Sequence, residues 1–131
     1  MRAAVGVGGA VGTLGRYVLE LRLAPRDPAV LPLVTLGINL EGAFLLGAVM
    51  TLVLEVWPPT RLARPFLAIG LIGAFTTMSS FALETVRMLG AGAVLGAFVY
   101  VALSLGGGLV AALLGVVMAR SLAALRRRGR R

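Results

Sequence analysis

Four long apolar stretches, separated by short segments that contain proline or charged residues, occupy almost the whole chain. Hydrophobic residues make up 59% of the 131 residues, and the mean hydropathy is +0.97. A globular domain of this length cannot bury so much apolar surface, whereas a bilayer solvates it, and one helical crossing takes roughly 20 apolar residues. The sequence therefore predicts an all-α membrane protein, a single domain of four transmembrane helices at about residues 3–21, 33–56, 65–88 and 91–122.

The third apolar stretch has a centre that does not suit a continuous helix. Residues 70–81 combine glycines with four hydroxyl residues, Thr76, Thr77, Ser79 and Ser80. Such residues have low helix propensity, and backbone groups released at membrane depth need a partner from protein, water or an ion. We therefore expect the third helix to be interrupted near its centre. Close packing against a neighbouring helix is the alternative reason for these small residues.

Cysteine, histidine and lysine are all absent from the sequence. No disulfide, thiolate metal site or imidazole proton shuttle can form, and a serine nucleophile has no histidine or lysine as its base. We therefore interpret the chain as a protein that is not an enzyme. Residues 123–131 are rich in arginine, and we expect a basic cytoplasmic tail beside anionic lipid headgroups, with no nucleic acid as partner.

Polar side chains inside the spans are the candidates for function, because they are costly in lipid and tend to face a cavity or a partner. Asn39 lies in an apolar span and offers two amide donors, which suit a small, strongly hydrated anion. Tyr100 and Ser104 are four residues apart and share a helix face, while Ser79 and Ser80 add hydroxyls beside the expected break. For each of them, a hydrogen bond that only packs two helices remains the alternative.

Three of the charged residues within the spans are also candidates for function. Arg16, near the end of the first span, can reach the interface or supply positive potential at the mouth of an anion path. Glu84 is expected near the opposite mouth. Glu41 is two residues, or about 200° of helix, from Asn39 and so points away from it. We expect Glu41 to be protonated, paired with an arginine or buried at an interface.

Three glycine-containing motifs, one in each of the first three spans, form a specific set. Residues 12–17 read Gly-Thr-Leu-Gly-Arg-Tyr, residues 39–47 read Asn-Leu-Glu-Gly-Ala-Phe-Leu-Leu-Gly, and residues 73–81 read Gly-Ala-Phe-Thr-Thr-Met-Ser-Ser-Phe. Together they resemble the signatures of the Fluc/CrcB fluoride channel family: a glycine-rich run ending in Arg-Tyr, an Asn-Gly-Phe-Gly motif and a broken third helix. The resemblance extends over all four spans.

The resemblance implies a channel that exports fluoride passively across the cell membrane. The family forms antiparallel dimers with two pores, each built from both subunits. By resemblance, Gly73 and Thr76 offer the carbonyls that hold a structural Na⁺ at the dimer centre. The pore is then lined by an amide, an aromatic ring edge and a track of hydroxyls, and the matching positions are Asn39, Phe81, Ser79, Ser80, Tyr100 and Ser104.

Two residues depart from the family pattern. Met78 occupies a pore position where the family usually has phenylalanine, and a thioether is polarisable but has no ring edge. Met78 lies three residues before Phe81, so both can face one direction if the helix resumes there. Glu41 is the second departure, and the resemblance assigns it no function.

The arginines are unevenly distributed. Nine lie at the termini and between the second and third spans, against four near the other ends of the spans. The positive-inside rule then places both termini in the cytoplasm. An antiparallel dimer needs chains that insert both ways, so the bias favours a partner that is a paralogous subunit of opposite bias over a second copy of this chain.

Two other functions are alternatives. A small four-helix, proton-coupled multidrug transporter needs a carboxylate in its first span, and this chain has Arg16 there with no carboxylate before Glu20. A non-conducting assembly subunit would explain Met78 as a residue released from pore function. The sequence alone leaves open whether one or both pores conduct.

Overall fold

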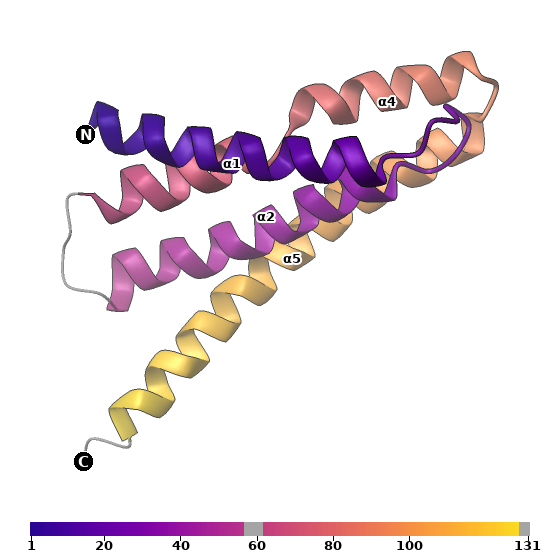
Figure 1. Ribbon diagram of the computed structural model, residues 1–131. Coiled ribbons are helices and arrows are strands. Elements are labelled where there is room, and N and C mark those ends of the chain that lie inside the picture. Colours follow the sequence, from indigo (N-terminus) through magenta and orange to yellow (C-terminus); the bar gives the residue numbers. More distant parts are fainter. Residues whose placement is uncertain (57–61, 129–131) are drawn as a thin grey trace.

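The computed structural model describes residues 1–56 and 62–128, and over these residues it consists of helices and short connections (Figure 1). Helix α1 spans Arg2–Leu23, and α2 (Leu33–Thr51) continues into the π-helical segment η1 (Leu52–Val56). The third rod comprises η2 (Arg64–Ile72), α3 (Gly73–Phe75) and α4 (Met78–Gly90), and the last helix is α5 (Val94–Arg128). The predicted all-α class is confirmed for the described residues.

Three of these helical rods are long and apolar enough to cross a membrane: Leu33–Val56, Arg64–Gly90 and Val94–Leu125. The chain is therefore a multi-pass membrane protein. Helix α1 is not among the three, because its five glycines, together with Arg16 and Glu20, lower its hydropathy. Three helical rods of spanning length thus lie where the sequence predicts the last three spans, and α1 lies alongside them (Figure 1).

The boundaries of the last helix differ from the predicted residues 91–122. Gly92 has a φ of +78° and forms a turn after α4, so α5 begins at Val94. Only glycine adopts this backbone conformation without strain. At the other end α5 continues to Arg128, so the predicted basic tail is helical over its first residues. Residues 129–131 and the arginine at position 61 lie outside the described part of the chain.

The four rods pair through glycines. Helix α1 runs beside the first half of the third rod, α2 lies along α5, and the start of α1 and the end of α5 lie at the same end of the bundle (Figure 1). A Cβ built on Gly12 would collide with the carbonyl oxygen of Leu71, and one on Gly115 would collide with that of Phe44. These pairs let the backbones approach closely, as small residues do in membrane helices.

The third rod is interrupted near its centre, as predicted. Thr76 and Thr77 adopt extended backbone angles, with ψ values of 153° and 117°, between α3 and α4. Figure 1 shows that α4 then follows a path displaced from the first half of the rod. A small apolar core of Leu36, Met88 and Ala97 packs around Tyr100 beside α4. Most other large apolar side chains are exposed on the single chain, as suits helices that face lipid or another subunit.

Candidate functional site

The side chain of Thr77 caps the helix that begins after the break. This residue precedes α4, and its hydroxyl accepts a hydrogen bond from the Ser80 amide at 3.1 Å. A threonine at this position satisfies one of the amides that the first turn of a helix leaves without a partner. The run of hydroxyl residues was predicted to weaken the third helix. One of them, Thr77, also caps the helix that begins after the break.

Asn39 of α2 binds the break from the facing helix. Its Oδ1 accepts from the Thr77 amide at 2.8 Å, and its Nδ2 donates to the Thr77 carbonyl at 3.1 Å. Both backbone groups of Thr77 are thus satisfied by one side chain, and one amide hydrogen of Asn39 is left over. The interhelical hydrogen bond that the sequence left as an alternative is present, and it places Asn39 beside the hydroxyl run.

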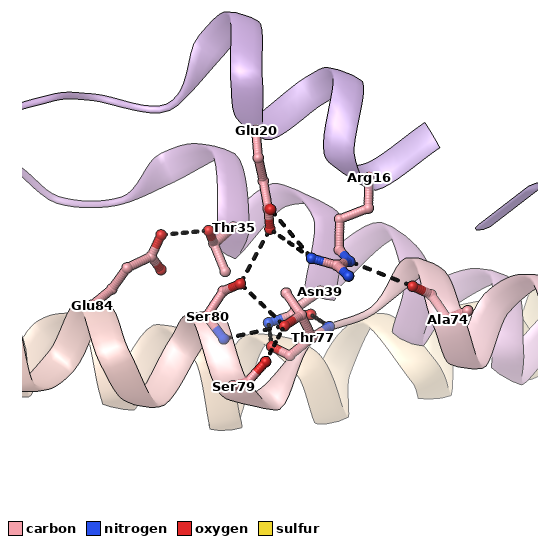
Figure 2. Close-up of polar contacts among 9 residues, drawn as sticks. All are labelled: Arg16, Glu20, Thr35, Asn39, Ala74, Thr77, Ser79, Ser80 and Glu84. Atoms are coloured by element: carbon pink, nitrogen blue, oxygen red, sulfur yellow. Dashed lines mark hydrogen bonds and ion pairs between the residues drawn. The ribbon is translucent and has the colours of Figure 1, made fainter. Parts of the chain in front are cut away.

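A row of hydroxyls leads from the break to α1 (Figure 2). Thr77 donates to Ser80 Oγ at 3.1 Å, and Ser80 in turn donates to Glu20 Oε1 at 3.2 Å. The Ser79 hydroxyl lies 3.2 Å from that of Thr77. Because Thr77 has given its one proton to Ser80, Ser79 is the donor of this contact. The row therefore points its protons in one direction, toward the carboxylate of Glu20.

Arg16 shares that carboxylate. Its Nη1 lies 3.2 Å and 3.4 Å from the two oxygens of Glu20, one helical turn away, and its Nε donates to the Ala74 carbonyl at 3.4 Å (Figure 2). Both side chains are 23% exposed. The positive charge expected of Arg16 at a mouth of the path is thus paired within α1.

Glu84 of α4 holds a second group of hydroxyls. Thr35 donates to its Oε1 at 2.6 Å and Tyr100 to its Oε2 at 2.7 Å. Thr35 is 1% exposed and Tyr100 0%. Glu84 also lines a cavity of about 140 Å³ with the connection between α1 and α2, together with Arg26 and Arg87. This places Glu84 beside a cavity at the end of the bundle away from the chain termini, with buried hydroxyls behind it.

Phe81 and Met78, which the sequence predicts to line the pore together, lie in different surroundings. The ring of Phe81 is 5.3 Å from that of Tyr100 at an interplanar angle of 46°, which presents ring edges rather than stacked faces. Met78 is 72% exposed on the single chain. Because α4 begins at Met78, residues 78 and 81 both belong to it, and a spacing of three on a helix places their side chains on the same side.

Ser104 and Glu41 have no polar contact within the described residues. The hydroxyl of Ser104 is buried without a hydrogen-bond partner among residues 1–56 and 62–128. The side chain of Glu41 is exposed on α2, and neither ion pair found in the described part includes it. We expected Glu41 to be protonated, paired with an arginine or buried at an interface. Among the described residues it has no arginine partner.

Two carbonyls at the break have lost their regular helical donors. The amide of Thr77, which would bond to Gly73 in a continuous α-helix, donates to Asn39. The amide of Ser80, which would bond to Thr76, donates to the Thr77 hydroxyl. The Gly73 and Thr76 carbonyls are therefore available as oxygen ligands, a chemistry that suits a hard cation. No cluster of three acidic side chains that could hold a metal occurs in the described chain.

Sequence reasoning missed three residues of this network. Glu20 follows Arg16 by four positions, and this spacing on a helix is the signal that predicts an ion pair. Thr35 precedes Asn39 by four positions and so lies on the same face of α2. Thr77 was recognised only as one of a run of hydroxyls, because its capping role depends on where α4 begins.

Comparison with known proteins gives a consistent result. Residues 3–116 match the model of the family described as CrcB-like protein, Camphor Resistance (CrcB). A protein of Streptomyces avermitilis named fluoride-specific ion channel FluC 3 is 44% identical over 118 residues, which cover 90% of this chain and 57% of that protein. This chain therefore spans less than two thirds of the length of that relative.

Other relatives are matched over more of their length. The fluoride-specific ion channel FluC 2 of Nocardia farcinica is 43% identical over 115 residues, covering 88% of this chain and 79% of the relative. The FluC protein of Chlorobium chlorochromatii is 43% identical over 119 residues, covering 91% and 92%. On the family match and these identities, the chain belongs to the CrcB-like protein family.

Proposed function

We propose that this chain is a subunit of a fluoride-selective ion channel, which lets fluoride leave the cytoplasm passively and so lowers its concentration there. Relatives named as fluoride-specific ion channels support the proposal. The structural observation that carries it is the convergence of Asn39 and the hydroxyl row on the break of the third rod. These groups are neutral donors placed on helices at the centre of a membrane protein.

The chemistry of fluoride fits such a lining. A small, strongly hydrated anion leaves water only if other donors replace its hydration shell, and neutral donors do so without holding it too tightly to leave. Hydroxyls, an amide and the positive edge of an aromatic ring are donors of this kind. In the proposed path these are, from the break outward, Asn39, Ser79, Ser80, Phe81, Tyr100 and Ser104. Arg16 and Glu84 stand at the two mouths, and Met78 contributes its thioether from the protomer surface.

We place α1 across the membrane as the fourth span and pair the chain with a second subunit in the opposite orientation. Two exposed residues support this pairing. A carboxylate such as Glu41 is costly on a face in contact with lipid, and Met78 at the break is almost uncovered on the single chain. A second subunit that covers both would complete the two pores that the family resemblance implies.

The arginine distribution supports a paralogous partner in preference to a second copy. The start of α1 and the end of α5 lie at the same end of the bundle (Figure 1), so the arginines near the two termini add up on one side. That side is then the cytoplasmic one, and the chain has one preferred orientation. The antiparallel partner must carry the opposite bias.

A structural Na⁺ between the two subunits fits the break. When bound, the ion would supply positive charge to backbone oxygens that the helix no longer uses. Gly73 and Thr76 are the residues that would hold it, because the donors of both carbonyls are diverted to side chains. Gly73 is exposed on the single chain, where a partner subunit can share the ion.

Fluoride efflux from liposomes that contain the purified protein tests the proposed function. We expect fluoride efflux from the wild type without matching chloride efflux. Phe81→Ile removes the ring edge and should lower the fluoride rate about tenfold or more. Phe98→Ile is the matched control, since Phe98 is 69% exposed on α5 and outside the network. Equal rates for fluoride and chloride, or a proton-coupled cation flux, would contradict the proposal.

A further inference from the structure

Glu20 accepts hydrogen bonds both from the hydroxyl row at the break and from Arg16 on α1. Its Oε1 accepts from Ser80 at 3.2 Å and lies 3.4 Å from Arg16, and its Oε2 lies 3.2 Å from the same guanidinium (Figure 2). We propose that Glu20 is a resident anion: its carboxylate occupies the place of fluoride between Ser80 and Arg16, and fluoride must displace it to pass. The inference rests on the proposed function and names the residue that sets anion affinity at this end of the path.

The hydroxyl protons carry the first step of the argument. A hydroxyl donates once, and Ser80 gives its proton to Glu20 while it accepts from Thr77. Ser79 likewise gives its proton to Thr77. In this arrangement every hydroxyl proton of the row is committed, and fluoride, which only accepts, finds no free hydroxyl donor in the row. The hydrogen bond from Ser80 to Glu20 must break before Ser80 can donate to an incoming anion.

The charge of Arg16 carries the second step. A guanidinium at a mouth attracts anions, but here the ion pair with Glu20 cancels its positive charge within one helical turn. Both side chains are only 23% exposed, so salt in the surrounding water screens the pair less than it would screen a surface pair. Fluoride therefore meets a neutral pair instead of a cation as long as Glu20 stays in place.

The position of Glu20 permits the displacement. It lies in the last turns of α1, and among the described residues its side chain makes one hydrogen bond to another helix, with Ser80. Rotation of one side chain toward solvent frees both the Ser80 hydroxyl and Nη1 of Arg16, while Nε keeps its bond to the Ala74 carbonyl and holds the guanidinium in place. Glu20 thus competes with the permeating ion without closing the path permanently.

Glu20→Gln tests the inference, because glutamine keeps the size of the side chain and removes its charge. Efflux is measured over a range of internal fluoride concentrations. We expect the half-saturating fluoride concentration to fall about three- to tenfold, the range for losing one partly buried charge-assisted competitor. In the double variant Glu20→Gln and Ser80→Ala the half-saturating concentration should not fall, because the Ser80 hydroxyl that Glu20→Gln frees for fluoride is then missing.

Glu41→Gln is the matched control. It removes another carboxylate from a helix of the bundle, but Glu41 has no polar contact among the described residues. If Glu41→Gln lowers the half-saturating concentration as much as Glu20→Gln does, a general loss of negative charge explains the effect and the inference is overturned. An unchanged or raised value in Glu20→Gln overturns it as well.

A binding measurement separates this inference from the proposed function. The melting temperature of the solubilised protein is recorded with increasing fluoride, since a bound ligand stabilises the folded state. We expect fluoride to raise it at lower concentrations in Glu20→Gln than in the wild type. Fluoride efflux from the wild type with identical fluoride dependence in both proteins overturns the inference alone. If neither protein conducts fluoride and neither is stabilised by it, the proposed function falls together with the inference.

Discussion

At the scale of single residues, side-chain hydrogen bonds replace backbone hydrogen bonds at the helix break. Asn39 satisfies both backbone groups of Thr77, and the Thr77 hydroxyl satisfies the amide of Ser80. In a membrane an unsatisfied backbone group has no water to bond to, so these contacts decide whether the break is stable. The same contacts place hydroxyls and an amide in one small region, which is why structure and proposed conduction depend on the same residues.

Replacement of Asn39 by leucine should lower both the stability of the protein and its proposed fluoride conduction. Asn39→Leu keeps a similar volume and removes two hydrogen bonds to Thr77, which leaves a buried amide and carbonyl without partners. We expect a loss of about 2–4 kcal/mol in stability and a large drop in fluoride efflux. Thermal or denaturant unfolding of the solubilised protein measures the first quantity, and the liposome assay measures the second.

Ser104→Ala provides the comparison for stability. The Ser104 hydroxyl is buried and has no hydrogen-bond partner in the described part of the chain. Its removal from the single subunit should therefore leave stability unchanged or slightly raised, in contrast to Asn39→Leu. A loss of stability equal to that of Asn39→Leu would mean that Ser104 has a partner in the assembled protein.

At the scale of elements, glycine contacts fix how α2 and α5 cross. Gly47 of α2 meets the backbone of Ala112, and Gly115 of α5 meets that of Phe44, so each helix presents a glycine to the other. The backbones are close enough that no side chain fits between them. In lipid, where apolar burial gives little drive for helices to associate, this close contact is a main source of attraction.

Gly115→Ala should therefore separate the two helices. The added Cβ would collide with the Phe44 carbonyl oxygen, which is backbone and cannot move independently of α2. We expect a lower melting temperature and a lower yield of folded protein. Gly106→Ala on the same helix meets nothing within 4 Å and should be neutral or stabilising by up to about 1 kcal/mol. Equal behaviour of the two variants would contradict this account of the crossing.

At the scale of the whole molecule, orientation in the membrane decides which assembly can form. The arginine excess near the termini predicts one preferred orientation, and an ion pair of Glu55 with Arg120, at 2.6 Å and 3.0 Å, links η1 to α5 toward that end of the bundle. A chain with one orientation cannot supply both members of an antiparallel pair. The antiparallel pair that we propose would then need a partner of opposite bias.

Cysteine labelling can measure the orientation directly. The native chain has no cysteine, so Ala29→Cys, exposed in the connection between α1 and α2, and Gly129→Cys, in the basic tail that follows the last span, introduce single labelling sites. We expect a membrane-impermeant reagent added outside intact cells to label Ala29→Cys and to leave Gly129→Cys unlabelled until the cells are opened. Equal labelling of both from outside would indicate dual orientation and favour a homodimer.

The sequence by itself determined the class of the protein and the location of its irregular backbone. Apolar stretches of spanning length need only be counted, and a run of glycines and hydroxyls in one of them weakens a helix wherever that helix lies. The four-residue spacing of Arg16 and Glu20 was also a signal for their ion pair, although the prediction from the sequence did not include Glu20 in the site. The motif set likewise sufficed to identify the family.

Only the tertiary structure decided which groups each polar side chain bonds to. Asn39 and Thr77 are 38 residues apart, and Ser80 and Glu20 are 60 apart, so no local period connects them. The direction of the hydroxyl row and its end at Glu20 follow from how α1 and α2 pack against the broken rod. A local sequence pattern indicates which residues share one face of a helix. A hydrogen bond between two helices depends on how those helices cross, and the crossing exists only in the folded protein.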